Sequence, residues 1–281
     1  MIIGAINKVS VVRESDIAYV LTDGHEELFL HKKEALHPYL PGEEIEVFIY
    51  VDNIGRPTAS TKTPFCSISH AGWLEVVSVS YELGVFVHYG LVKDALLSKD
   101  DLPLSLAQWP IIGDKLICIL KEKKHHIFAK QIGRKSVRQY FQPSIIHEEG
   151  VFVDGWVSYL LLEGLIVFTL QGDEIFVHYN NTRKTYRIGE MVSVRILKRQ
   201  ESLEYMGSLI GQKETMLDVD SKRIIEYLQN HAGSMRFTDK SSPVDIQAAF
   251  RMSKGAFKRA LGTLYKANLV ELLDDSTILK S

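Results

Sequence analysis

The stretches EELFLH at residues 26–31 and PGEEIEVFI at residues 41–49 return in altered form as DEIFVHY at residues 173–179 and IGEMVSVRI at residues 188–196. A middle copy reads DALLS at residues 94–98 and then IGDKLICI at residues 112–119. Each copy joins a β-rich segment, a loop with glycine and charge, and a strand of alternating β-branched residues. Because such a repeat decides the architecture before local propensity does, the sequence predicts three related β modules.

The three copies divide the 281-residue chain into unequal parts. They predict β domains at residues 1–63, 64–139 and 140–214, and they leave residues 215–281 as a different fourth domain. Modules of this size bury limited apolar surface when isolated. We therefore expect the modules to pack on one another.

The last quarter of the chain changes from a period of two to a helical period. Apolar residues at 224–228 predict one amphipathic helix. Ser242 followed by Pro243 predicts the start of a second helix, and Ser253 predicts the cap of a third. Residues 269–279 then read as a hairpin. Three helices followed by a hairpin are typical of a winged helix-turn-helix domain.

These segments resemble a known family. The β modules look like S1 domains, and FTDKSSP at residues 237–243 with MSKGAFKRALG at residues 252–262 resembles the C-terminal signature of the CvfB/YitL family. That family is described as bacterial RNA-binding regulators with several S1 domains and a terminal winged helix. The resemblance implies a mainly β fold with an α/β tail, in which three tandem S1-type OB-fold β-barrels precede a winged helix-turn-helix domain.

The resemblance also implies positions for an RNA-binding face. S1 domains commonly place an aromatic residue on the second strand and a histidine at the end of the third. The strand-two positions are Tyr19, Phe86 and Ile166, and the strand-three positions are His31, Ser98 and His178. Ile166 and Ser98 depart from the family pattern, which favours a surface composed from several modules.

Two phenylalanines share a strand face with these histidines. Residues i and i+2 of a strand point to the same side, so Phe29 pairs with His31 and Phe176 with His178. Each phenylalanine is either barrel core or a stacking platform for a base. We include Phe176 among the candidate RNA contacts.

Basic residues are densest in the third module. After His178 and Tyr179 come six cations within seventeen residues: Arg183, Lys184, Arg187, Arg195, Lys198 and Arg199. Cations of this kind neutralise phosphates and make binding salt-dependent, although a charge run can equally be a solvated surface. A second basic row, Lys254, Lys258 and Arg259, lies on the last expected helix, where a winged helix contacts phosphates or a groove.

The whole-chain charge of −2 does not by itself indicate a nucleic-acid binder, but the charge is uneven. The first domain holds 6 Lys/Arg and 10 Asp/Glu, a net −4, whereas the second holds 10 and 7, a net +3. Cys66 and Cys118 form no CxxC pattern, so we expect no metal and no cofactor. Residues 1–8 lack the basic and then apolar pattern of a secretory leader, so we expect none. The longest apolar run, residues 159–170, is interrupted by Glu163 and Gly164 and is too short to span a bilayer. We expect a cytoplasmic monomer that avoids membranes.

The leading hypothesis is a non-enzymatic regulator that binds single-stranded RNA through a surface assembled from the S1 modules, chiefly the third, together with the winged helix. The net charge of −4 argues against the first module as the strongest RNA contact. An RNA enzyme would need a metal-binding carboxylate cluster or an acid–base pair, and none stands out. A regulator that binds duplex DNA through the winged helix is a further alternative, as is a protein-interaction scaffold of the translation or transcription machinery. Salt dependence and preference for single strands separate these classes.

Overall fold

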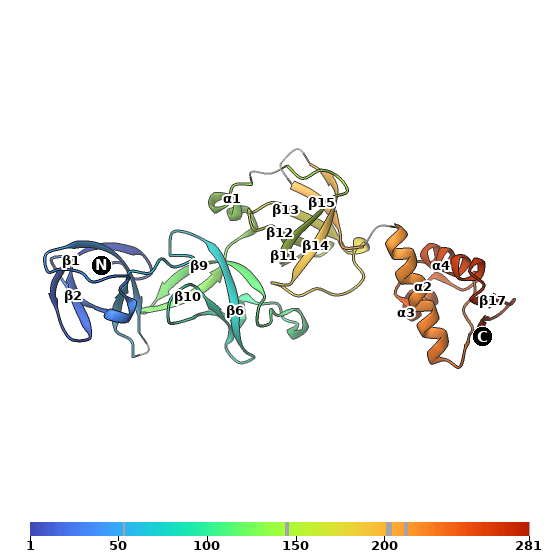
Figure 1. The fold of residues 1–281 in the computed structure, drawn as a ribbon, viewed down its shortest axis with the longest axis horizontal. Coiled ribbons are helices and arrows are strands. Elements are labelled where there is room, and N and C mark those ends of the chain that lie inside the picture. The colour runs from blue at the N-terminus through green and yellow to red at the C-terminus, as the bar shows by residue number, and fades with distance from the viewer. Residues whose placement is uncertain (53, 144–145, 201–203, 211–212, 281) are drawn as a thin grey trace. The chain divides into compact units, whose positions relative to one another are not determined.

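The computed structural model describes residues 1–281 except 53, 144–145, 201–203, 211–212 and 281, and for residues 213–218 it describes only the backbone (Figure 1). It contains three closed five-stranded barrels, followed by helices with a small sheet. The fold class predicted from the sequence is confirmed. Among the described residues, no helix is long and apolar enough to cross a membrane.

The first barrel contains β1 (Ile6–Glu14), β2 (Ala18–Thr22), β3 (Glu27–His31), β4 (Glu44–Val51) and β5 (Pro57–Ser60). The strand order is β1-β2-β3-β5-β4, with β3 parallel to β5. Alternate side chains such as Leu28 and Leu30 fill the interior. A hairpin turn at Asp23 joins β2 and β3, and the Asp23 carboxylate accepts the Glu26 N–H there at 3.0 Å.

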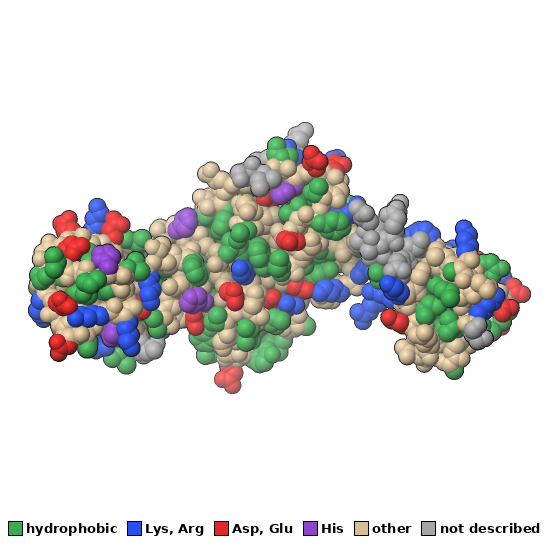
Figure 2. Space-filling view, in the orientation of Figure 1, with side chains coloured by type: hydrophobic (Ala, Val, Ile, Leu, Met, Phe, Trp, Pro, Cys, Tyr) green, Lys and Arg blue, Asp and Glu red, His purple; other side chains and the backbone are tan. Residues whose placement is uncertain are grey.

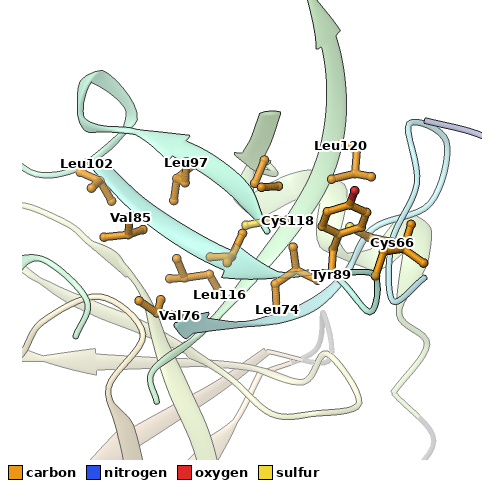
Figure 3. Packing of buried hydrophobic residues seen from close by; sticks show 14 of the residues in the cluster. Cys66, Leu74, Val76, Val85, Tyr89, Leu97, Leu102, Leu116, Cys118 and Leu120 are labelled. Atoms are coloured by element: carbon orange, nitrogen blue, oxygen red, sulfur yellow. The ribbon is translucent and has the colours of Figure 1, made fainter. Parts of the chain in front are cut away.

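The second barrel repeats this order with β6 (Gly72–Ser80), β7 (Gly84–His88), β8 (Ala95–Ser98), β9 (Lys115–Lys123) and β10 (His126–Gln131). Between β8 and β9 the chain adds two 3-10 turns, η2 (Lys99–Asp101) and η3 (Leu106–Gln108). Figure 3 shows the core of this barrel, in which Cys66 and Cys118 are buried free thiols. Burial raises the pKa of the Cys66 thiol to about 12, so neither packing nor charge favours a reactive thiolate here.

The third barrel contains β11 (Phe152–Leu160), β12 (Gly164–Phe168), β13 (Glu174–His178), β14 (Met191–Arg199) and β15 (Glu204–Ser208), with β13 parallel to β15. The turn η5 (Tyr179–Asn181) follows β13. The segment between the second and third barrels contains η4 (Arg134–Ser136) and the short helix α1 (Val137–Tyr140).

Side chains join neighbouring barrels, as expected for small modules. Lys93 of the second barrel donates to the carbonyls of Val51 and Asp52 in the first, at 3.2 and 3.1 Å. The rings of Trp73 and Trp156 lie 5.0 Å apart, which places the two tryptophans at packing contacts between the second and third barrels. The three barrels therefore share apolar and polar contacts rather than standing as independent domains.

The C-terminal region contains α2 (Lys213–Asn230), α3 (Pro243–Phe250), α4 (Lys254–Lys266) and a three-stranded sheet of β16 (Ser234–Met235), β18 (Thr277–Leu279) and β17 (Val270–Leu272). Both predicted caps are confirmed, since Ser242 accepts the Asp245 N–H at 3.1 Å and Ser253 accepts the Ala256 N–H at 3.2 Å. The helices and the hairpin of β17 and β18 form the winged helix.

The chain forms two compact units: residues 1–177 with 185–207, and residues 178–184 with 208–281. The predicted borders after residues 63 and 139 fall between barrels. The predicted border after residue 214 falls just inside α2, which begins at Lys213. The domain borders themselves stay predictions.

Candidate nucleic-acid interface

Strand β3 presents an exposed aromatic ring on the surface of the first barrel. Its side chains alternate between the exposed face and the core, so Leu28 and Leu30 are buried while Phe29 is 55% exposed. The parallel partner β5 places Thr58 opposite Phe29, and the Thr58 hydroxyl donates to the Phe29 carbonyl at 2.9 Å. The Phe29 ring is therefore held on a rigid strand with its surface accessible to a ligand.

His31 ends the same strand on the same exposed face. Its Nδ1 accepts the N–H of Lys33 at 3.1 Å and so caps the turn η1 (Lys32–Glu34). Because Nδ1 is an acceptor, the neutral ring carries its proton on Nε2. His31 therefore presents an N–H donor two residues from Phe29.

The loop between β4 and β5 holds a guanidinium near these residues. The Asp52 carboxylate accepts the backbone N–H of Ile54 and of Arg56, each at 2.9 Å, and pairs with the Arg56 side chain at 2.9–3.1 Å. Burial pushes the pKa of Asp52 upward, but these hydrogen bonds outweigh it and hold the pKa below its usual value. Asp52 is therefore ionised at neutral pH and orients an exposed Arg56.

These residues line one groove with a volume of about 1230 Å³. The wall includes Phe29, His31, Lys33 and Arg56, together with the carboxylates of Glu26 and Glu27. The groove thus combines an aromatic ring, N–H donors and the cations Lys33 and Arg56 with four carboxylates, those of Glu26, Glu27, Glu34 and Asp52. An aromatic ring beside cations is the combination on which single-stranded nucleic acids stack and pair their phosphates.

Tyr19 is not part of this surface. It is buried in the barrel core, where its ring packs edge-on against Tyr39 at 5.8 Å. The pairing of β2 with β3 puts Tyr19 opposite the buried Leu30, whereas Val20 lies opposite Phe29. The ring of Tyr19 is therefore not available for stacking on a base, and we leave it out of the proposed surface.

The equivalent face of the second barrel is smaller. Phe86 is half-buried on β7 and lines a pocket of about 130 Å³ with Phe128 and Leu96. Ser98 stands where the other barrels have histidine, and its hydroxyl accepts the Asp100 N–H at 3.3 Å. Phe86 is thus only partly exposed, beside a small pocket.

In the third barrel, Phe176 is half-buried against other residues. Its ring lies over Gly164, where an added Cβ would approach ring carbon Cε2 within 2.8 Å. Phe176 also packs against a cluster that includes Ile117 and Phe168. Nδ1 of His178 accepts the Asn180 N–H at 3.0 Å and caps η5, and Tyr179 is exposed. In this barrel Phe176 is therefore partly covered, whereas Tyr179 is exposed.

Two arginines predicted to contact RNA make ion pairs instead. Arg187 joins Asp114 of the second barrel through two hydrogen bonds of 2.7 and 2.9 Å, and it contacts Glu190 at 3.2 Å. Arg183 pairs with the buried Asp220 at 3.2 Å within the C-terminal unit. These pairings give both arginines a structural role and correct the expectation of a continuous phosphate-binding stripe.

The remaining predicted cations lie nearer to solvent. Lys184 and Lys198 are exposed, and Arg195 is half-buried on β14. On α4, Lys258 faces Asp239 at 3.5 Å, Lys254 donates to the Lys240 carbonyl at 3.4 Å, and Arg259 is exposed. On α4, Lys258 and Arg259 are thus exposed and Lys254 is half-buried, and contact of this row with nucleic acid stays a prediction.

Three residues of the groove are not among the contacts predicted from the sequence. The pattern around Phe29 allows either barrel core or a stacking platform, and Lys33 and Arg56 lie outside the predicted basic clusters. Phe29 could be recognised as exposed from its position between Leu28 and Leu30, because alternate residues of a strand point to opposite faces of the barrel wall. The signal for Arg56 was weaker, since its position depends on the Asp52 turn.

Comparison with known proteins gives the family. An S1 domain family model matches residues 3–62, a CvfB first S1-like domain matches residues 71–130, and a CvfB-like winged helix domain matches residues 222–279. The Bacillus subtilis protein YitL is 37% identical over 259 residues, which cover 92% of this chain and 87% of that protein. The chain belongs to the CvfB/YitL family.

Other CvfB/YitL relatives match over similar lengths. Conserved virulence factor B of Staphylococcus saprophyticus is 33% identical, covering 82% of this chain and 78% of its own. A crystal structure of a multidomain protein with nucleic acid binding domains from Streptococcus pneumoniae is 28% identical, has a TM-score of 0.68, and covers 99% of this chain and 98% of its own. The family domains are of nucleic-acid-binding types rather than enzyme types.

Proposed function

We propose that this CvfB/YitL protein binds single-stranded RNA without converting it and thereby regulates gene expression after transcription. The observation that carries the proposal is the exposed Phe29 ring in a groove with His31, Lys33 and Arg56. The S1 and winged helix family matches support the same class of ligand.

The groove chemistry favours a single strand. Stacking of one base on an aromatic ring contributes roughly 1–3 kcal/mol and tolerates any base. In a duplex the base faces are already stacked, so Phe29 gains little from it. Lys33 and the exposed guanidinium of Arg56 would neutralise backbone phosphates next to the stacked base.

His31 gives a physical reason for RNA over DNA. Its Nε2–H faces away from the capped turn and can donate to a 2′-hydroxyl, which DNA lacks. Additional phosphate contacts are proposed separately for Lys198 on β14 and for the row Lys254, Lys258 and Arg259 on α4. Roles in RNA binding stay predictions for Phe86, Phe176, His178, Tyr179, Lys184 and Arg195.

A fluorescence-anisotropy titration of labelled single-stranded RNA at two salt concentrations tests the proposal. Phe29→Ala should weaken binding by about tenfold or more, in line with the loss of one stacked base. Phe152→Ala is the matched control, because Phe152 is 52% exposed on β11 of the third barrel. Wild-type affinity in Phe29→Ala would contradict the groove assignment, and equal affinity for duplex RNA would contradict single-strand recognition.

A further inference from the structure

The second barrel carries an apolar patch that RNA binding does not explain. The patch consists of exposed side chains from the β6–β7 turn and from the insertion between β8 and β9: Tyr81, Leu83, Leu104, Leu106, Ile111 and Ile112. Figure 2 shows hydrophobic side chains gathered over the lower end of this barrel, with acidic side chains at the edge. Exposed aliphatic groups in such a concentration mark interaction sites on soluble proteins.

The insertion that forms the patch is anchored. Leu102 and Trp109 are buried in the core of the second barrel. The Trp109 indole N–H donates to the Pro103 carbonyl at 2.7 Å, and its ring lies 6.2 Å from that of Tyr81. The exposed leucines therefore sit on a fixed loop, which is a preorganised surface rather than a frayed one.

The two segments that form the patch, the β6–β7 turn and the insertion, belong to one surface. The Lys99 N–H donates to the Leu83 carbonyl at 2.8 Å and ties the start of the insertion to the β6–β7 turn. The two segments hold the exposed acids Glu82, Asp100 and Asp101 and the single base Lys99. Asp101 also faces Lys130 at 3.7 Å. The apolar surface thus has a predominantly acidic rim.

The acidic side chains around the patch determine which kind of partner can bind there. Phosphates of a nucleic acid and an anionic lipid surface would both meet like charge at Glu82 and Asp100. A second copy of this chain related by a two-fold axis would place the same acids against each other. A protein segment with apolar anchors and flanking lysines or arginines satisfies both the patch and its rim.

We propose that this patch docks a basic amphipathic helix of a partner protein. Leucine-like anchors at i, i+3, i+4 and i+7 would cover Leu104, Leu106 and Ile112, and flanking cations would face Asp100 and Glu82. The patch shares no residue with the groove of the first barrel, so this interaction goes beyond the proposed binding of RNA.

The test uses the full chain and a labelled synthetic helix that has leucines at i, i+3, i+4 and i+7 and lysines beside them. A second peptide replaces the lysines by glutamates. The variant Leu104→Ser with Leu106→Ser is compared with the control Leu162→Ser with Leu170→Ser. In each pair one leucine is almost fully exposed and the other is about half exposed, and the control pair lies on the third barrel.

The basic peptide should bind wild type and the control equally, and the Leu104/Leu106 variant about tenfold or more weakly. The acidic peptide should bind poorly, and Glu82→Lys with Asp100→Lys should reverse that preference. Equal binding to wild type and to the Leu104/Leu106 variant would overturn the proposal, as would absence of binding to wild type. Sedimentation showing a wild-type dimer that the Leu104/Leu106 variant abolishes would overturn it in favour of self-association. The Leu104/Leu106 variant should bind RNA as wild type does, so a loss of peptide binding in it is independent of the proposed RNA-binding function.

Discussion

Replacing Arg187 by alanine removes the ion pair that links the third barrel to the second. The guanidinium makes two hydrogen bonds to Asp114, at 2.7 and 2.9 Å, and one contact to Glu190 at 3.2 Å. The Asp114 side chain is 7% exposed and Arg187 is 27% exposed. The substitution therefore leaves a nearly buried carboxylate without its cation.

Removing one partner of a buried ion pair costs roughly 3–5 kcal/mol. Because a quarter of Arg187 remains in water, and Asp114 still accepts the Ile111 N–H at 2.8 Å, we expect a loss of about 2–4 kcal/mol in local stability. This loss should weaken the hydrogen bonds that join the two barrels, such as that from the Lys115 N–H to the Gly189 carbonyl at 3.1 Å.

Amide hydrogen exchange measures this local opening directly. The Lys115 amide and the Ile188 amide, which donates to the Gln108 carbonyl at 3.0 Å, should lose protection in Arg187→Ala. Lys198→Ala, which removes an exposed cation on β14, should leave both amides unchanged. An arginine bound to phosphate would instead reduce the salt slope of RNA binding by about 1. Unchanged protection together with such a reduced slope would refute the structural role.

Three further outcomes follow from the described contacts. Arg183→Ala strands the buried carboxylate of Asp220, so α2–α4 should lose about 2–4 kcal/mol in exchange stability; wild-type exchange there would contradict the pair. Burial and neighbouring carboxylates raise the pKa of Tyr50 to about 12 from 10.0, so between those values the unfolded chain has lost the proton and the folded chain keeps it. Stability should fall as pH rises through that window, by up to about 3 kcal/mol, and denaturant titrations should show no such component in Tyr50→Phe. Because the pKa of Asp52 is lowered, its carboxylate stays ionised and holds the Arg56 turn until the pH falls through that lowered pKa. Asp52→Ala should therefore weaken RNA binding equally at pH 6 and at pH 8. A weakening seen at only one of these pH values would exclude this explanation.

The barrels could be predicted because repetition and alternation act locally. Leu28 and Leu30 are buried and Phe29 is exposed because successive residues of a strand point to opposite faces. Ser242 and Ser253 cap α3 and α4 because a side-chain oxygen meets free N–H groups at a helix start. Such signals lie within a few residues of one another in the chain.

The errors arose from register and from long-range pairing. Tyr19 was assigned to the wrong face, and a shift of one residue reverses every side chain of a strand. Arg187 and Arg183 looked like free cations because their partners, Asp114 and Asp220, lie 73 and 37 residues away. A charge run in sequence does not distinguish a phosphate contact from a structural ion pair.

The groove of the first barrel is most directly tested by ultraviolet cross-linking of the full chain to single-stranded RNA, followed by mass spectrometry of the peptides. The account predicts cross-links on β3, at Phe29 and His31, and their loss in Phe29→Ala. Cross-links confined to β14 and α4, with β3 unmodified, would contradict it.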